Sequence, residues 1–358
     1  MVLANSLGVS CGQIFAVTIP AFAILEVKDM DVSPGLALRN ATANQTLQVP
    51  GAPSALAARL IEQAGFGATY LSGATLSANT LGMPDVGLLT LPELVQHVTY
   101  LTRNVTIPVI VDADTGFGEV INVLRTVVEL EAAGAAAMQL EDQVLPKRCG
   151  HLSGKTLVDP SAMCAKIYAA CEARFDPDFV IIARTDARDS EGLDAAIERA
   201  LSYVDAGADW IFPEALASEE EFKIFAEEMP VPLIANMTEF GKSPLLPHSK
   251  FAKLGYAAVL YPVTLMRIAM RAMEAALGVI NSTGSQETLL HRMQTRAELY
   301  ELLDYDGFQE KDRHFFDFAD EDEIEDGEGK IEDEIEEEEH EDGEGKIEDD
   351  DIEEDDQD

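Results

Sequence analysis

The sequence predicts an α/β protein whose parallel strands close into a (β/α)8 barrel. Three observations predict this fold class: short apolar runs alternate with amphipathic helical patterns, the alternation recurs eight times from about residue 45, and polar side chains gather where the runs end. Strands that are apolar almost throughout indicate a parallel sheet covered on both faces. A doubly wound open sheet is the competing arrangement.

The strands are expected in order along the chain, each followed by a polar turn. They are Leu47–Val49, Ala68–Ser72, Pro108–Asp114, Ala135–Asp142, Phe179–Asp186, Trp210–Glu214, Pro232–Asn236 and Ala258–Pro262. Helical patterns lie between them, among them Ser54–Gly65, Leu91–Arg103, Glu119–Ala133, Gly192–Ala206 and Ser218–Met229. Several end at or beside glycine, as helix C-termini commonly do.

Polar residues at the strand ends favour the barrel over the open sheet. The set comprises Ser72, Asp112, Asp114, Glu141, Arg184, Asp186, Glu214 and Asn236. In a (β/α)8 barrel the chemistry is carried at the C-terminal ends of the strands. Loops begin with polar residues in any fold, but rarely with so many carboxylates together with an arginine and an amide.

Two amphipathic helices are expected after the eighth strand, Thr264–Ile280 and Glu287–Leu303. They exceed what barrel closure requires, and their apolar faces, including Met270, Met273 and Leu299, need a surface to cover. One interpretation is packing under their own barrel. The other is exchange of a helix with a neighbouring subunit, which would make the protein an obligate homo-oligomer.

The chain is expected to divide into residues 1–40, an unassigned extension, residues 41–316, the barrel with its C-terminal helices, and residues 317–358, an acidic tail. The tail holds 27 acidic residues and two lysines, which accounts for −25 of the formal charge of −41. So polar a segment cannot bury enough apolar surface to order itself, so disorder is predicted. Its repeat, Glu325–Asp333 and Glu341–Asp349, resembles the middle of a calcium loop, but Ile324 and His340 stand at the first-ligand positions, which favours a solvated tail.

Composition excludes several classes of protein. The acidic body has no basic face, so no nucleic-acid partner is expected. The apolar run Ile14–Val27 is interrupted by Pro20 and is too short to span a bilayer, so no membrane partner is expected. Four irregularly spaced cysteines form neither a disulfide framework nor a zinc site. These features favour a reducing intracellular compartment, cytoplasmic, or mitochondrial if the chain is eukaryotic.

The stretch Glu141–His151 carries the strongest chemical signal. Its single thiol, Cys149, has three basic neighbours in sequence, Lys147, Arg148 and His151. Nearby cations lower the pKa of a thiol, so Cys149 is expected to exchange a proton near neutral pH. The plain alternative is a surface cysteine in a basic turn.

Two aspartates predict a magnesium site. Asp112 and Asp114 lie two apart on one predicted strand, so their side chains are expected on the same face. Hard oxygen ligands with few histidines suit Mg2+, which usually binds one or two carboxylates and keeps several waters. A turn that ends the strand is the alternative.

Several motifs in order resemble the isocitrate lyase and phosphoenolpyruvate mutase superfamily: Tyr70–Gly73, Leu81–Asp85, Val111–Gly118, Leu140–Gln143 and Lys147–His151. Further motifs are similar to the short, bacterial-type 2-methylisocitrate lyases of that superfamily: Ala183–Ala187, Phe212–Ala215, Asn236–Gly241, Leu260–Pro262 with Arg267, and Met293–Tyr300. The resemblance covers roughly residues 45–313.

The resemblance implies a helix-swapped barrel that assembles as a dimer or tetramer, binds Mg2+, and cleaves 2-methylisocitrate into pyruvate and succinate in propionate catabolism. Leu152–Gly154 after His151, and Ala74 where glycine is usual, depart from the pattern. Related 2,3-dimethylmalate lyases and oxaloacetate hydrolases therefore stay open as alternatives, although Pro262 and Arg267 suit the methylisocitrate branch. A non-catalytic barrel with a partner-binding acidic tail is a different class of answer, against which the intact catalytic set argues.

The resemblance also implies residue roles. Cys149 is the expected general acid and Tyr70 the expected base, the latter only if cations depress its pKa. The metal is expected at Asp112 and Asp114 with Asp85 and Glu141. Substrate is expected to contact Ser72, Gly73 and Ala74 at its pyruvate half, Arg184 at a carboxylate, and Gly150, His151, Glu214, Asn236, Thr238 and Arg267 elsewhere, with Arg184 and His151 counted as catalytic.

Overall fold

The computed structural model describes residues 32–152 and 154–325, with residues 317–325 described by their backbone alone. The chain divides into two units after Leu303, and each is described by itself.

Eight parallel strands form the centre of the first unit. They are β1 (Leu47–Pro50), β2 (Thr69–Leu71), β3 (Val109–Asp112), β4 (Ala137–Glu141), β5 (Val180–Thr185), β6 (Trp210–Pro213), β7 (Ile234–Asn236) and β8 (Ala258–Tyr261). All eight expected strands are confirmed, with ends shifted by at most two residues.

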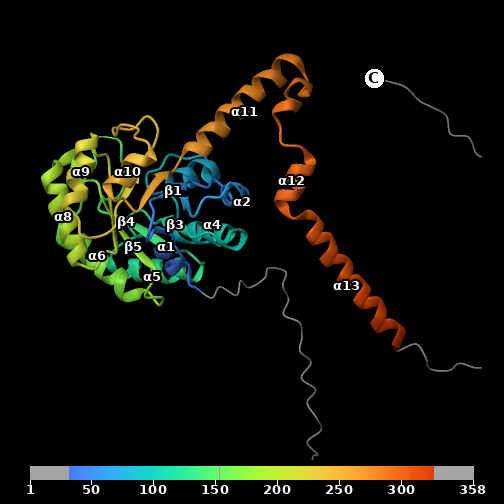
Figure 1. The fold of residues 1–358 in the computed structure, drawn as a ribbon, viewed down its shortest axis with the longest axis horizontal. Coiled ribbons are helices and arrows are strands. Elements are labelled where there is room, and N and C mark those ends of the chain that lie inside the picture. The colour runs from blue at the N-terminus through green and yellow to red at the C-terminus, as the bar shows by residue number, and fades with distance from the viewer. Residues whose placement is uncertain (1–31, 153, 326–358) are drawn as a thin grey trace, which may run out of the picture. The chain divides into compact units, whose positions relative to one another are not determined.

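The strands are neighbours in sequence order throughout, which distinguishes the barrel from a doubly wound sheet. Ladders join β2 through β6 in one set, and β7, β8 and β1 in the other. Single parallel bridges, Gly51 to Tyr70 and Ile211 to Leu233, connect the two sets. The predicted (β/α)8 class is therefore confirmed (Figure 1).

Helices surround the strands: α2 (Ala55–Gln63), α3 (Gly73–Leu76) running into a π-helical turn (Ser77–Leu81), α4 (Leu91–Asn104), α5 (Val120–Ala132), α6 (Pro160–Ala173), α7 (Ala187–Ser190), α8 (Leu193–Asp205), α9 (Glu219–Glu228) and α10 (His248–Leu254). Their starts follow local sequence. Ser54 and Ser218 cap α2 and α9, and Thr90 forms a capping box with Glu93 at α4.

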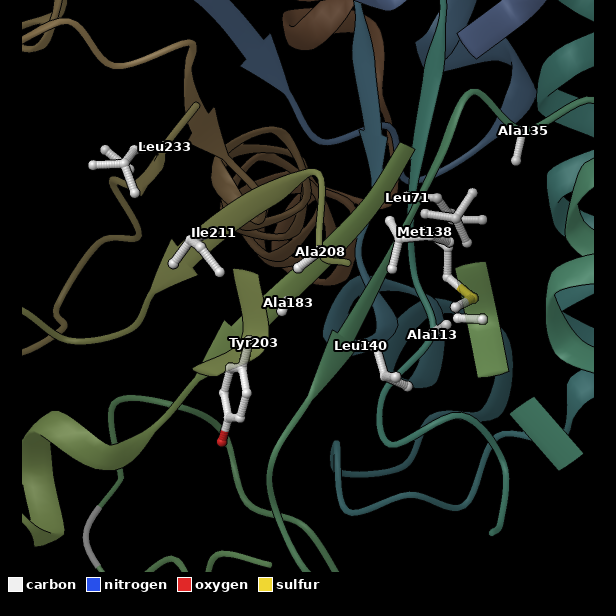
Figure 2. Close-up of a cluster of buried hydrophobic side chains, with 14 of the residues drawn as sticks. Leu71, Ala113, Ala135, Met138, Leu140, Ala183, Tyr203, Ala208, Ile211 and Leu233 are labelled. Atoms are coloured by element: carbon white, nitrogen blue, oxygen red, sulfur yellow. The ribbon is translucent and has the colours of Figure 1, made fainter. Parts of the chain in front are cut away.

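Two apolar layers use alternate residues of each strand. Leu47, Val49, Tyr70, Ile182 and Phe212 belong to the cluster inside the barrel. Leu71, Met138, Leu140 and Ile211 belong to the cluster between strands and helices (Figure 2). Because successive side chains of a strand point to opposite faces, both faces must be apolar, which explains the nearly continuous apolar runs.

A helix that was not expected, α1 (Pro34–Thr42), belongs to the barrel. Ser33 caps it, with Pro34 at its first position. Leu38 is fully buried in the cluster inside the barrel, and Arg39 donates to the Asp178 carbonyl at 2.9 Å and to Asp209 at 2.8 Å. The expected boundary after residue 40 thus falls inside this helix.

The helices after β8 differ from expectation in one respect. α11 (Thr264–Thr283) is present and leaves the barrel, with none of its residues buried (Figure 1). The single helix expected over Glu287–Leu303 is wrong: a 3-10 segment (Glu287–Arg292) is followed by α12 (Arg296–Leu303). Thr295 donates to Glu298 through N at 2.6 Å and Oγ1 at 2.7 Å, and this capping pair begins a new helix.

The second unit contains α13 (Tyr305–Glu325), a helix that was not expected. It extends past residue 317, so the expected start of the acidic tail lies within it. Glu is a good helix former, which fits a helix here. The tail from residue 326, with its repeat and calcium-loop resemblance, and the apolar run Ile14–Val27 lie outside the described residues. Within the described residues, no helix has the length and hydropathy needed to cross a bilayer.

The packing of Leu38 yields a stability prediction. Leu38→Ala should lower the free energy of unfolding by about 2–5 kcal/mol, because a buried leucine loses both its transfer free energy and its packing. Urea denaturation followed by circular dichroism measures it. Leu201→Ala, at a position on α8 that is 36% exposed, is the matched helical control. Equal losses in the two variants would show that α1 is not part of the core.

Candidate active site

A cavity of about 140 Å3 lies at the C-terminal ends of the strands. Thirteen of the expected site residues line it: Tyr70, Ser72, Ala74, Asp85, Asp112, Cys149, Gly150, His151, Arg184, Glu214, Asn236, Thr238 and Arg267. Apolar residues complete the wall: Phe212, Leu260, Pro262, Val263 and Met266. The remaining expected residues, Gly73, Asp114 and Glu141, contact residues of the lining.

Asp112 and Asp114 converge, but not through strand alternation. β3 ends at Asp112, and Asp114 adopts a left-handed φ of 49°. The Asp114 amide donates to Asp112 Oδ1 at 3.2 Å, and the Gly73 amide donates to Asp112 Oδ2 at 3.1 Å. A Cβ on Gly73 would lie 3.1 Å from Asp114 Oδ1 and 3.3 Å from Asp112 Oδ2. Both carboxylates therefore meet at the Gly73 backbone, and the strand-based expectation is corrected.

Lys147 is part of this acidic group rather than a neighbour of the thiol. Its Nζ is 2.7 Å from Asp85 Oδ1 and also pairs with Asp114. Burial opposes its charge, but the carboxylates, Glu141 foremost, outweigh burial and raise the pKa of Lys147. Burial also raises the pKa of Asp114, to about 7, although Lys147 counteracts it.

Glu141 is buried at the end of β4, and neither of its carboxylate oxygens has a hydrogen-bond partner among the described residues. Burial raises its pKa well above the usual value. In the part of the chain that the structure describes, no three His, Cys, Asp or Glu side chains cluster as a ready metal cage.

Arg184 is held among three carboxylates. Its Nε and Nη2 donate to Asp186 at 3.0 and 3.1 Å, which occupies one edge of the guanidinium. Nη1 is 3.4 Å from Glu141 and Nη2 is 3.3 Å from Glu214. The Nε–Nη2 edge is therefore hydrogen-bonded to Asp186, and each Nη atom also faces a buried carboxylate.

Glu214 joins two cavity walls. Its Oε1 is 2.8 Å from His151 Nε2, and Asn236 Nδ2 donates to its carboxylate at 3.3 Å. Burial opposes ionisation, but Arg184 and His151 outweigh it and lower the pKa of Glu214 to about 2. His151 Nδ1 accepts from the Lys242 amide at 2.9 Å, which assigns the ring proton to Nε2.

The pKa expectation for Cys149 is wrong in sign. Cys149 lines the cavity although the residue as a whole is exposed, and partial burial of its thiol raises its pKa, with a smaller opposing effect of the His151 backbone. Lys147 and His151 do not lower it as expected, because they face Asp114 and Glu214. A raised pKa keeps the thiol protonated at neutral pH, which suits an acid.

Tyr70 also differs from expectation. Its hydroxyl donates to Gln139 Oε1 at 2.6 Å. Burial, followed by the charge of Asp112, raises the pKa of Tyr70 well above its usual value, and Arg184 does not reverse this. The protein's own charges thus keep Tyr70 protonated, as a hydrogen-bond donor.

Two buried residues that hold the carboxylates of the site, Gln139 and Lys155, were not predicted from the sequence. Gln139 carries a signal, since it is a polar residue inside an apolar strand, and it donates to Asp112 at 3.1 Å. Lys155, which pairs with Asp186 at 2.8 Å, carries none, because its partner lies on another strand end.

Comparison with known proteins agrees with this geometry. The family described as "Phosphoenolpyruvate phosphomutase" matches residues 38–280. A 2-methylisocitrate lyase of Aeropyrum pernix is 52% identical over 280 residues, covering 78% of this chain and 90% of the relative. One of Bacillus subtilis is 49% identical over 272 residues, covering 76% and 89%.

Solved structures show the same fold. A 2,3-dimethylmalate lyase, described as a member of the PEP mutase/isocitrate lyase superfamily, superposes with a TM-score of 0.75 at 33% identity, covering 79% of this chain and 95% of that one. A phosphonopyruvate hydrolase in complex with oxalate and Mg2+ superposes with a TM-score of 0.73 at 31% identity, covering 80% and 100%.

Proposed function

The chain belongs to the phosphoenolpyruvate mutase and isocitrate lyase superfamily, and from that premise we propose that it is a Mg2+-dependent carbon–carbon lyase that cleaves 2-methylisocitrate into pyruvate and succinate. Relatives that carry this name at about half identity over three quarters of the chain support the assignment. In an organism that oxidises propionate, this reaction would release the three-carbon product.

One observation carries the proposal: a protonated thiol and a group of buried carboxylates face one small cavity. Cys149 and Asp112 both line it, together with Arg184. Cleavage beside a tertiary hydroxyl needs an acceptor for the hydroxyl proton, stabilisation of the developing oxyanion, and an acid for the departing carbanion. Cys149 is the acid in this proposal.

The other side chains bind and orient the substrate. Arg184 contacts a substrate carboxylate through its guanidinium group, while Ser72, Gly73 and Ala74 lie beside the pyruvate half. His151, Asn236, Thr238 and Arg267 receive the succinate half, and Gly150 and Glu214 bring the loop against it. Phe212 and Leu260 offer an apolar wall to its hydrocarbon part. Tyr70 acts as a donor rather than as the base, and the buried carboxylates are the proton acceptors that the site offers.

The residues fit a magnesium ion. Asp112 and Asp114 converge on Gly73, and the Glu141 carboxylate, whose oxygens accept no hydrogen bond among the described residues, lies at the same end of the barrel. Mg2+ needs only one or two protein carboxylates besides water and substrate, so the lack of a three-residue cage among the described residues is no obstacle. Asp112 and Asp114 would hold the ion with Asp85 and Glu141 around them, and its chemistry would be that of a Lewis acid on the substrate hydroxyl.

We propose further that the protein is a homo-oligomer that exchanges α11. This helix has no buried residue, and Ile268, Met273 and Leu277 are 62%, 51% and 66% exposed. An apolar groove of about 380 Å3, lined by Leu60, Ile61 and Phe66 among others, lies on the barrel where α11 departs. The groove lies over β1 and β8, through Gln48, Pro50 and Tyr261. In a (β/α)8 barrel a helix normally covers this pair of strands, so we assign the groove to the α11 of a second copy. Free Cys149, Cys164 and Cys171 fit a reducing intracellular compartment.

The substrate assignment is tested with purified protein, Mg2+ and a panel of 2-methylisocitrate, isocitrate, 2,3-dimethylmalate and oxaloacetate. Pyruvate from 2-methylisocitrate should be released with the highest kcat/KM. A preference for 2,3-dimethylmalate or oxaloacetate would move the chain to the corresponding branch of the superfamily. The absence of measurable turnover with all four compounds would support a non-catalytic barrel.

Cys149→Ser should lower kcat by at least about a thousandfold and leave KM nearly unchanged, because a serine hydroxyl is a much weaker acid. Steady-state kinetics measures both. Wild-type kcat should fall on the alkaline side, as the thiol with its raised pKa loses its proton. The control is Cys164→Ser, at a thiol on α6 that donates a hydrogen bond to the Ser202 carbonyl of α8. Retained turnover in Cys149→Ser would exclude the acid role.

Removal of the metal should abolish turnover, and Asp114→Ala should reduce it by about a hundredfold or more at every Mg2+ concentration, because a ligand to the ion is lost. Activity after chelation and Mg2+ titration measures both effects. Asp194→Ala, at an exposed position of α8, serves as control. Full turnover by the chelated wild type would contradict the magnesium assignment.

Light scattering on a sizing column should give a mass well above the 38.8 kDa of one chain. The double variant Met273→Asp with Leu277→Asp should shift it toward one chain, because burying two carboxylates in an apolar interface is unfavourable. Ile121→Asp, at a position on α5 that is 72% exposed, should leave the mass unchanged. A wild-type monomer at micromolar concentration would rule out helix exchange.

A further inference from the structure

The loop Val144–Leu157, of which residue 153 lies outside the described residues, is fastened at its base and its tip. The Val144 amide donates to the Thr156 carbonyl at 2.8 Å, and Gln143 pairs with Leu157. At the tip, a tight turn is closed by the Leu152 amide on the Cys149 carbonyl at 2.8 Å. The thiol is therefore carried by a short turn whose position depends on how the tip is held.

Among the described residues, Lys147, His151 and Lys155 attach this loop to the barrel through charged or ring contacts. Lys147 reaches Asp85 and Asp114, and His151 reaches Glu214. These two contacts belong to the site already described. The third side chain, Lys155, is not used by the proposed reaction and is not among the described residues that line the cavity.

Lys155 has a fully buried side chain with two partners. Its Nζ is 2.8 Å from Asp186 Oδ1 and donates to the Gly150 carbonyl. Burying an ammonium group is strongly unfavourable unless it is paired and hydrogen-bonded, so a buried lysine outside the cavity lining needs an explanation. The carbonyl it binds belongs to the residue directly after Cys149.

The other partner, Asp186, is rigidly held. Its Oδ1 also accepts from Arg184 Nη2 at 3.1 Å, and its Oδ2 accepts from Arg184 Nε at 3.0 Å. Its amide donates to Asp142 at 2.9 Å, and Asp142 also accepts from Tyr203 at 2.8 Å. A single carboxylate thus holds both the arginine expected to bind substrate and the lysine attached to the loop tip.

The contact between tip and arginine is close. A Cβ on Gly150 would lie 2.3 Å from Arg184 Nη2 and 2.5 Å from Glu214 Cγ, so the loop backbone itself rests on both side chains. Only a residue without a side chain allows this approach. The thiol's place over the cavity is then set against the same Arg184 that orients the substrate.

We propose that Lys155 is a positioning residue that fastens the Gly150 carbonyl to Asp186 and thereby fixes the Cys149 thiol relative to Arg184. The proposal rests on the proposed role of Cys149 in the lyase reaction. A displacement of about 1 Å at a reacting group lowers rates by about a hundredfold, so loss of the fastening should act on turnover. A merely structural lysine would affect stability and leave the thiol's reactivity alone.

The test uses the full-length, Mg2+-loaded enzyme with Lys155→Met, which keeps the length of the side chain and removes its charge and donors. Lys250→Met, at an exposed lysine paired with Glu219 at 2.7 Å, is the control. Alkylation by iodoacetamide is followed at each cysteine by peptide mass spectrometry, and kcat and KM are measured with 2-methylisocitrate. Should Lys155→Met fail to fold, Lys155→Gln, which keeps a polar end, replaces it.

In Lys155→Met, Cys149 should be alkylated at least about fivefold faster, because the turn that carries the thiol is no longer held by the Lys155 contact to the Gly150 carbonyl, so the thiol is more accessible and its charge is opposed less by partial burial. Its kcat should fall about a hundredfold while KM changes by less than about threefold. Cys164 and Cys171 should react at wild-type rates.

Three outcomes would overturn the proposal: an unchanged Cys149 rate, an equal acceleration at Cys164 and Cys171, or a rise in KM without loss of kcat. Alkylation needs no substrate, so it separates this inference from the proposed function. If the wild type fails to cleave 2-methylisocitrate but Lys155→Met still exposes Cys149, the proposed substrate is wrong and the positioning role stands.

Discussion

The buried ion group around Arg184 is the constraint on which the site depends. A guanidinium held nine-tenths or more out of water requires compensating charge, and Asp186, Glu141 and Glu214 provide it within 3.0–3.4 Å. The barrel supplies these partners through its register. Glu141 lies opposite Arg184 in the β4–β5 ladder. In the β5–β6 ladder, Arg184 lies opposite Phe212, two residues before Glu214. A one-residue slip of either strand would turn these side chains away, so fold and site are specified together.

Close approach of backbone to side chain is the second feature that the site needs. Gly73 lets two carboxylates meet at one amide, and Gly150 lets the loop rest on Arg184 and Glu214. Both glycines stand where a Cβ would collide with a functional group. The absence of a side chain at these two positions is therefore as necessary for the site as the charged groups around them.

The elements were predictable because their signals are local and periodic. All eight strands follow from apolar runs with turns at their ends, and most helices follow from their amphipathic pattern. The break at Thr295 was missed although its capping pair with Glu298 is written in the sequence, because the apolar pattern continues across it. α1 was missed because its apolar contacts are with the far end of the barrel rather than with its neighbours in the chain.

Which residues line the cavity was largely predictable, from the strand ends for Ser72, Asp112, Arg184, Glu214 and Asn236, and from the family resemblance for Cys149, His151 and Arg267, but the electrostatics of the site was not. Lys147 and Cys149 are close in sequence, yet Lys147 forms ion pairs with Asp85 and Asp114. The pKa of the Cys149 thiol is therefore raised and not lowered. Charge effects depend on spatial partners, which sequence spacing does not give.

The position of α1 has a practical consequence. Arg39 of α1 binds the Asp178 carbonyl and Asp209, which lie just before β5 and β6, so α1 lies at the N-terminal ends of the strands, opposite the cavity. A reporter domain or surface anchor fused directly ahead of Ser33, in place of residues 1–32, would therefore be attached away from the cavity, which makes that end suited to immobilising the enzyme.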